Sequence, residues 1–514
     1  MGEALGAGGF SFPKVYKESK DRVTKLVQRG VLDLVDISRW NIADEFMAFV
    51  LERKLLPFAD RTYPNPRLKN EVPIWFLISC QLLLRALGEV AYQALTPLLS
   101  AGPVLTRVGL NVVAPIGFND KNRYPRVSPV HQDAVRKFFK DTEPRAMRRW
   151  FNIDLQRWFK QQGMFDENNG TYILDQTHVV VPDNPNYEDA VRMPVDEHGQ
   201  RYPGYNDLTE EQKKLMPHHP CYTLSTLLHL NFKKQTAHVA GYEWGPGHED
   251  ELPQGRRLID RFFTNNGPGA IKLLIADRGY ICGKFITYVK QTYQVDVLIP
   301  LKRSMDQYRD AVAIATMPET NWMVVLKRGD DLKDLTRELK ATTVSDIQLW
   351  DECKVPLYVT VIEESKTDDE TGARFVGHFA LASTRKFTTS ADVVSSYGFR
   401  GRTEECYRQL KLSWNLAKFP SPDRALIEAH VSFSLLTFCL FQLFLAEKHA
   451  GHRRSRMLTA LRREHQKLGQ SLVLYAEEYF GLFGNREYLK LLLELPEEVR
   501  IKLKNRIESI PNLF

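Results

Sequence analysis

Two aspartates interrupt apolar, strand-like patterns. Asp175 lies in the middle of the segment TYILDQTHVVV at 171–181, and Asp277 follows the apolar run at 271–276, in the sequence ADRGY. A carboxylate on a buried strand costs free energy unless it is protonated, paired with a cation or bound to a metal ion. Each aspartate alone is more commonly a salt-bridged or capping residue. Their joint occurrence makes them a candidate pair of metal-binding carboxylates.

The segment YGFRGRTEECYRQLK at 397–411 supplies a third carboxylate among cations. At about 100° per residue on one continuous helix, its polar residues fall on a narrow stripe. From Tyr397 at 0°, Arg400 falls at about −60°, Glu404 at about −20° and Lys411 at about −40°. Arg408 joins them at about +20°, whereas the neighbouring Glu405 falls near +80°. Such a face can hold a metal ion through Glu404 and phosphates through the cations. The alternative is a helical salt-bridge stripe with Tyr397 packed inward.

The pattern Y-x2-R-x3-E-x6-K resembles the signature of prokaryotic insertion-sequence DDE transposases, the cut-and-paste group that includes hairpin-forming members. The chain matches it at all four positions and is also similar to that family in D-x-T at 175–177 and in ADRGY at 276–280. The acidic residues are 277 − 175 = 102 and 404 − 277 = 127 positions apart, and the long second gap accommodates a β-rich insertion. One departure is visible: Gly401 and Thr403 stand where members often have Trp and an aliphatic residue.

The resemblance implies that Asp175, Asp277 and Glu404 are catalytic and hold two Mg²⁺ or Mn²⁺ ions. Such ions activate water or a 3′-hydroxyl and stabilise the leaving oxygen. The implied reaction is nicking at transposon ends followed by attack of the freed 3′-hydroxyl, with terminal inverted repeats and target DNA as partners and a homodimer on DNA. The implied DNA-binding residues are Tyr397, Arg400, Arg408, Lys411, Arg278, Trp322 and Trp350. For Arg278, an ion pair with a local carboxylate is an equal alternative to DNA contact, and a tryptophan is more commonly a core residue.

Two other activities fit the same residues. A ribonuclease-H-like nuclease would cut DNA without strand transfer. A domesticated DNA-binding protein would keep the fold but not the chemistry, which the intact acidic triad argues against. Joining of transposon ends to target DNA separates the first alternative from a transposase.

The pattern of apolar residues predicts an α+β multidomain protein. Strands and helices are expected in the order β-β-β-α-β-α-β, which resembles a ribonuclease-H-like fold. The expected segments are Thr171–Val181, Cys221–Phe232, Gln235–Trp244, Leu252–Thr264, Ile271–Ala276, Phe285–Gln291 and Val295–Pro300. A β-rich insertion is expected to contain strands at Trp322–Lys327, Ile347–Trp350, Pro356–Ile362 and Phe375–Leu381, and a helix is expected at Ser390–Trp414.

The expected boundaries are a helical DNA-binding region at 1–165, a catalytic domain at 166–300 and 379–445, the insertion at 301–378 and a helical C-terminal region at 446–514. Within the first region, Leu32–Leu56 and Trp75–Leu87 show helical periodicity, and Gly102–Pro103 predicts a turn. Helix-turn-helix DNA binding and a plain helical bundle fit this pattern equally.

Residues 124–160 contain nine basic and four acidic residues, a local net charge of +5, with six Phe and Trp residues interleaved. The basic side chains, beginning with Arg126, suit phosphate contacts. The aromatic residues suit base stacking, but core packing is the commoner role for such rings.

Composition limits the class of protein. The chain of 514 residues has a net charge of +7, which suits a polyanionic partner without requiring one. Six scattered cysteines without a C-x-x-C pair argue against a zinc ribbon and favour a reducing compartment. The apolar run Val431–Leu445 is shorter than a membrane span and predicts a buried helix. We therefore expect a cytoplasmic, nucleoid-associated protein with no membrane partner.

Overall fold

The structure is a computed structural model that describes residues 16–38, 42–69, 71–99, 129–166, 168–202, 204–205, 208–330, 335–345, 350–368, 374–448 and 471–509. The predicted Gly102–Pro103 turn and Arg126 lie outside these residues. The chain divides into two compact units. Unit 1 comprises 1–154, 186–188 and 410–514, and unit 2 comprises 155–185 and 189–409. Helices and strands are both abundant, as expected for an α+β protein.

Unit 2 contains the predicted succession of strands and helices. The strands are β3 (Thr171–Val180), β5 (His219–Asn231), β6 (Thr236–Pro246), β7 (Leu273–Ala276) and β8 (Asp296–Pro300), with the helices α11 (Glu251–Asn266) and α12 (Gly283–Tyr293) between them. β5 pairs antiparallel with β3 and β6. β7 pairs parallel with β3 on one side and with β8 on the other. Parallel strands need a crossover, and α12 provides it between β7 and β8. The predicted order β-β-β-α-β-α-β is therefore confirmed.

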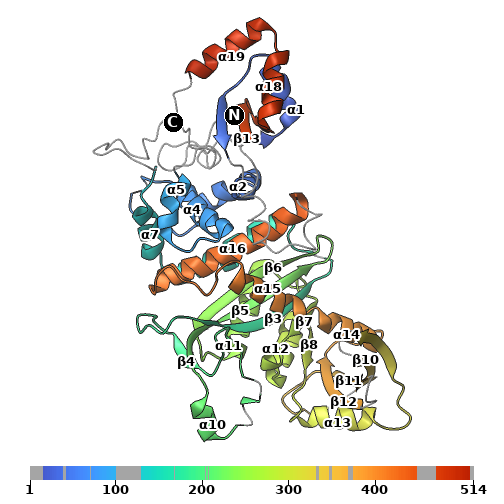
Figure 1. The fold of residues 1–514 in the computed structure, drawn as a ribbon. Coiled ribbons are helices and arrows are strands. Elements are labelled where there is room, and N and C mark those ends of the chain that lie inside the picture. The colour runs from blue at the N-terminus through green and yellow to red at the C-terminus, as the bar shows by residue number, and fades with distance from the viewer. Residues whose placement is uncertain are drawn as a thin grey trace. The chain divides into compact units, whose positions relative to one another are not determined.

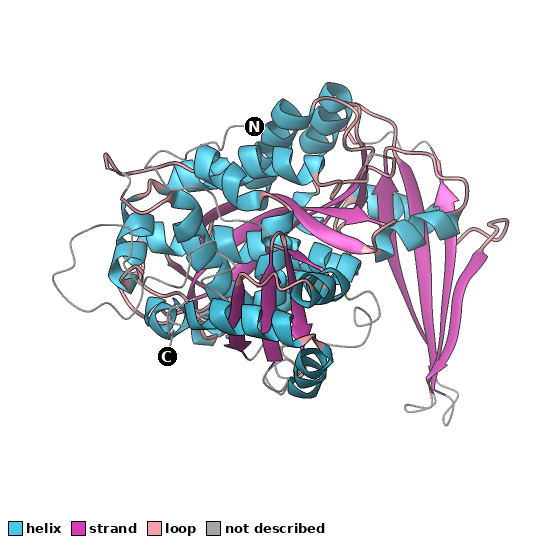
Figure 2. Cartoon of the chain, turned by 90° about the horizontal axis from the view of Figure 1, so that it is seen from above, coloured by secondary structure: helices cyan, strands magenta, loops and turns pink. Residues whose placement is uncertain are grey.

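The segment predicted as an insertion extends this same sheet. β12 (Arg374–Ser383) pairs antiparallel with β8, and β11 (Tyr358–Asp368), β10 (Leu335–Val344) and β9 (Met323–Asp330) follow in order. The long antiparallel strands run side by side at the edge of the sheet (Figure 2). Helix α13 (Asp306–Ala315) packs on β10, β11 and β12, and α14 (Ser390–Gly398) packs on β9 and β10 (Figure 1).

Two details of this segment differ from the sequence prediction. Strand β10 and helix α13 were not predicted. Of the predicted strand Ile347–Trp350, residues 347–349 lie outside the described residues and Trp350 is not in a strand. The polar segment before β5 contains the short strand β4 (Val191–Met193) and helix α10 (Glu210–Leu215).

Helix α11 lies unusually close to β3. A Cβ atom at Gly255 would lie 2.6 Å from the Tyr280 ring and 2.9 Å from a Leu174 methyl group, so only glycine fits there. Buried side chains of α11, such as Leu258 and Phe262, join Leu174 and Tyr280 in one hydrophobic cluster. This packing fixes the backbone on either side of Asp175 and Asp277.

The predicted helix Ser390–Trp414 is two helices. α14 ends at Gly398, and α15 (Gly401–Leu412) begins after a tight turn in which the Arg400 amide donates to the Tyr397 carbonyl at 2.9 Å. The single continuous stripe inferred for 397–411 is therefore wrong at its start.

Unit 1 is helical around a buried axis helix, α16 (Arg424–Lys448), which packs against α2 (Ile42–Glu52), α4 (Ile74–Leu87), α7 (Gln132–Asp141) and α8 (Pro144–Arg149). The other helices among the described residues of unit 1 are α1 (Lys20–Gln28), α3 (Leu55–Thr62), α5 (Leu95–Leu99), α18 (Asn485–Glu494) and α19 (Glu497–Ser509), together with the short 3-10 helix η1 (Tyr92–Ala94). A π-helix, η2 (Trp150–Leu155), follows α8, and the next helix, α9 (Gln156–Gln161), belongs to unit 2. Predicted helix 75–87 is confirmed, and it ends at Gly88, which has a left-handed φ of 79°.

Unit 1 also contains a small sheet that was not predicted. Its strands are β1 (Lys17–Glu18), β14 (Tyr479–Phe483), β13 (Ser471–Ala476) and β2 (Leu34–Ser38), in that spatial order. The expectation of helix throughout Leu32–Leu56 is thus wrong for β2, and the expectation of a helical C-terminal region is wrong for β13 and β14. Partners that lie more than 430 positions apart in sequence leave no local signal of pairing.

The aromatic side chains at 138–159, for which base stacking and core packing were both considered, are core residues. Phe138, Phe139, Trp150 and Trp158 are each at most 2% exposed. They are unavailable for base stacking. One of the interleaved cations, Arg148, pairs with the buried Glu428 at 2.5 Å. The remaining basic side chains of this region stay candidates for phosphate contacts.

Candidate active site

The strand pairing brings Asp175 and Asp277 together. β3 and β7 are parallel, and Leu174 pairs with Ala276. The next residue in sequence is an aspartate in both cases, so Asp175 and Asp277 lie side by side. The Asp277 amide donates to the Leu174 carbonyl at 3.3 Å. Adjacent parallel strands lie about 4.8 Å apart. Residues 102 positions apart in sequence thus become neighbours on the sheet.

Arg400 joins all three predicted carboxylates. Its Nη2 lies 2.9 Å from Asp277 Oδ1 and 3.6 Å from Asp175 Oδ2, and its Nη1 lies 2.8 Å from Glu404 Oε1. The carboxylates converge on one guanidinium from β3, from the end of β7 and from the first turn of α15. The site is open on the Glu404 side, because that side chain is 62% exposed whereas Asp175 is 6% exposed.

Tyr407 anchors α15 to β3. Its hydroxyl donates to the backbone carbonyl of Asp175 at 2.7 Å and shares a 2.8 Å hydrogen bond with Thr226 on β5. The side chain is buried, and Thr403 and Cys406 on the same helix face are buried too. The sequence analysis missed Tyr407, although its position three residues after Glu404 places it next to the inferred polar stripe on the helix.

Burial dominates the electrostatics of Asp175. Desolvation raises the pKa of this carboxyl to about 7, against the opposing effect of Arg400, and the negative charge of Asp277 raises it further. The charged groups around Asp175 also act on Tyr397. Its burial raises its pKa to about 12, and the charges of Arg400, Asp277 and Arg278 all act on it. Tyr397 is therefore within electrostatic reach of Asp175 and Asp277, and Arg278 is within reach of Tyr397.

A fourth carboxylate, Glu251, lies at this site and was missed. It begins α11, and its charge raises the pKa of Asp175, while burial and then Asp277 raise the pKa of Glu251 itself. Its Oε2 is buried without a hydrogen-bond partner, and a Cβ atom at Gly279 would lie 1.4 Å from that oxygen. The glycine of ADRGY thus makes room for Glu251. Nothing in the local sequence distinguishes Glu251 from other acidic residues that begin helices.

Other predicted residues are not gathered at the three carboxylates. Arg408 pairs with Glu405 at 2.6 Å, so it is not the neighbour of Glu404 that helical geometry predicted. Lys411 lies in the last turn of α15. Trp322 and Trp350 are half-buried and pack against the hydrophobic cluster of unit 2. Of the two roles considered for these tryptophans, this packing is the commoner one, that of a core residue.

The donors suit a hard cation, because Mg²⁺ and Mn²⁺ prefer carboxylate oxygen. The orphaned Oε2 of Glu251 adds another oxygen without a partner. Within the described part of the chain, however, no three potential ligands stand close enough together to hold one ion without rearrangement. Of the three carboxylates around Arg400, the Glu404 side chain is the most exposed, at 62%.

The transposase DDE domain family matches residues 168–440, more than half of the chain. The chain belongs to this family. A comparison with curated proteins found no match. The matched range includes β3, β7 and α15, so it contains each of the three carboxylates in this DDE transposase.

Family membership makes this transposase a DNA-cleaving and DNA-joining enzyme, and DDE transposases generally use divalent metal ions. Helix α16 is long and apolar enough to cross a membrane, but 83% of its most apolar stretch is buried inside the structure. Such burial is typical of a core helix, which agrees with the prediction for Val431–Leu445.

Proposed function

We propose that the transposase cuts DNA at the ends of an insertion sequence and joins the freed 3′-ends to target DNA. Asp175, Asp277 and Glu404 are the catalytic residues in this proposal and would hold two Mg²⁺ or Mn²⁺ ions. The observation that carries it is the convergence of these three carboxylates on Arg400. Metal ions would supply a deprotonated water or 3′-hydroxyl and stabilise charge on the leaving oxygen.

The protein's own groups position the reacting strand. Arg400 and Tyr397 lie beside the carboxylates, and Arg278 is exposed on the same turn as Asp277. A guanidinium and a phenol can donate to the oxygens of a phosphodiester. Lys411 belongs to the same signature, and we propose it contacts DNA further along α15. Arg408 is held by Glu405 and contributes less.

The strand order β6-β5-β3-β7-β8 supports a ribonuclease-H-like catalytic domain. The signature at 397–411 supports the hairpin-forming group of insertion-sequence transposases. Two ends must be processed together, so we propose a homodimer on DNA.

A strand-transfer assay tests this function. Full-length protein is mixed with Mg²⁺, a labelled duplex ending in the inverted repeat that flanks the gene, and a target plasmid. Labelled DNA joined to the plasmid supports the proposal, and a hairpin on a denaturing gel identifies the second-strand route. Cleavage without joining supports a nuclease instead, and binding without cleavage supports a DNA-binding protein.

A further inference from the structure

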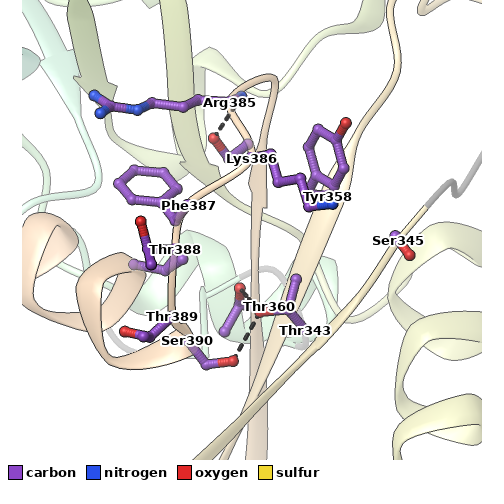
Figure 3. Close-up of a pocket in the computed structure, with 12 residues that line it drawn as sticks. Thr343, Ser345, Tyr358, Thr360, Arg385, Lys386, Phe387, Thr388, Thr389 and Ser390 are labelled. Carbon is purple, nitrogen blue, oxygen red and sulfur yellow. Dashed lines mark hydrogen bonds between the residues drawn. The ribbon is translucent and has the colours of Figure 1, made fainter.

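A polar pocket lies where the antiparallel strands of unit 2 meet the start of α14 (Figure 3). Its volume is about 210 Å³. The side chains that line it are mainly hydroxyls together with Arg385 and Lys386, and no carboxylate is among them. A cavity with this lining attracts an oxyanion rather than a metal ion or an apolar ligand.

Three hydroxyls from three different elements form one side of the pocket. Thr343 Oγ1 of β10 lies 2.9 Å from Thr360 Oγ1 of β11 and 2.8 Å from Ser390 Oγ of α14. Figure 3 shows the three side chains pointing toward one another. A hydroxyl has one donor and two acceptor positions, so this group can turn a donor toward a bound oxygen.

The two cations lie on the loop between β12 and α14. Both are exposed, and neither forms an ion pair with a carboxylate in the described residues. Arg385 lies over the Phe387 ring at 5.2 Å, and the Lys386 side chain extends toward Tyr358 (Figure 3). By contrast, Arg337 on the neighbouring strand β10 is balanced, because it pairs with Glu364 at 2.7 Å. The pocket therefore carries uncompensated positive charge.

Helix α14 links this pocket to the acidic site. Its first turn, capped by Thr389, borders the pocket, and Tyr397 lies near its other end. Eight residues at 1.5 Å per residue separate the two points by about 12 Å. One DNA strand carries one charge per nucleotide, so a separation of about 12 Å corresponds to a few nucleotides at most.

We propose that the pocket binds a backbone phosphate of the transposon end, a few nucleotides from the phosphodiester at the acidic site. Arg385 and Lys386 neutralise the phosphate, and the hydroxyls of Thr343 and Ser390 fix its oxygens. The proposal rests on the proposed function for the identity of the DNA. It adds a contact that holds the end in register with the carboxylates.

The test is DNA binding by full-length protein carrying Arg385→Ala and Lys386→Ala, measured against salt concentration in EDTA. Losing one phosphate contact lowers the slope of log K against log salt by about 1. The matched control is Lys213→Ala with Lys214→Ala on α10, which removes the same charge outside the pocket. A slope that is unchanged, or reduced equally in the control, overturns the proposal.

Two further measurements separate the pocket from general charge. Thr343→Val keeps the charge, so weaker binding with an unchanged salt slope is expected. A scan of single methylphosphonates, numbered from the transposon end, should find one position that weakens wild-type binding but not binding by the double variant. Identical scans for the two proteins contradict the proposal. Because binding is read without cleavage, failure of the proposed reaction would appear separately in the strand-transfer assay.

Discussion

The guanidinium of Arg400 lies 2.9 Å from the carboxylate of Asp277, and the same side chain reaches Asp175 and Glu404. Three carboxylates with one shared cation leave an excess of negative charge. Each carboxylate repels the others, and burial of Asp175 adds to the cost. The site is therefore arranged for more positive charge than Arg400 supplies.

Replacement of Arg400 by Ala tests this balance. Without Mg²⁺ we expect a loss of about 1–3 kcal/mol in the free energy of unfolding, less than for a fully buried pair because Glu404 is mostly exposed. Mg²⁺ should stabilise the variant more than the wild type, because the ion replaces the missing cation. Thermal denaturation with and without Mg²⁺ measures both effects. Arg408→Ala is the control, and an equal Mg²⁺ response in all three proteins contradicts the account.

Tyr407→Phe tests the anchor between α15 and β3. The variant loses the hydrogen bond to the Asp175 carbonyl, which should cost about 1 kcal/mol of stability and lower strand transfer. Tyr308→Phe is a matched control, because the Tyr308 hydroxyl donates to the His378 carbonyl at 2.8 Å away from the acidic residues. Equal loss of strand transfer in both variants would mean that Tyr407 has no special role in positioning Glu404.

The pKa of Asp175 predicts how stability depends on pH without metal. The folded value of about 7 lies above the unfolded value of about 3.9, so the folded protein binds more protons between them. This contribution is fully present below about pH 4 and is lost as the pH rises through about 7. Asp175→Asn should remove the decline, on the order of 1–4 kcal/mol. Denaturation in EDTA at several pH values measures it, and parallel curves for wild type and variant would refute the prediction.

Glu251→Gln tests the carboxylate that the sequence did not reveal. The Glu251 charge raises the pKa of Asp175, so removing it should move the midpoint of the stability decline to lower pH. The same denaturation series in EDTA measures the midpoint. Glu249→Gln is the control, because Glu249 lies close to Glu251 in sequence but its charge pairs with Arg257 at 2.5 Å. A midpoint that stays in place in Glu251→Gln would show that the Glu251 charge does not reach Asp175.

The parts of the fold that could be predicted are those with strong local periodicity. The strand containing Asp175, the hairpin of β5 and β6, and helix α11 have apolar patterns that burial enforces. The pairing of β2 with β13 could not be predicted, because the partners are far apart and each strand is short. The turn at Phe399 and Arg400 was missed because helical periodicity continues across it.

The candidate site likewise combines residues that the sequence identifies and residues that only the fold brings together. Asp277 and Glu404 could be chosen from their sequence motifs. The bridging role of Arg400 could not, since it requires the turn before α15 and the register of β3 on β7. Tyr407 and Glu251 contribute through burial and proximity, which a single sequence does not encode locally.

The central claim is that Glu404, rather than its neighbour Glu405, completes the acidic site. Glu404 pairs with Arg400, which also reaches the two aspartates, whereas Glu405 pairs with Arg408. Strand transfer by full-length Glu404→Gln and Glu405→Gln, with inverted-repeat DNA and Mg²⁺, tests it most directly. We expect Glu404→Gln to bind DNA but lose cleavage and joining, and Glu405→Gln to retain both within a few-fold. Joining by Glu404→Gln at the wild-type rate would contradict the assignment of the site.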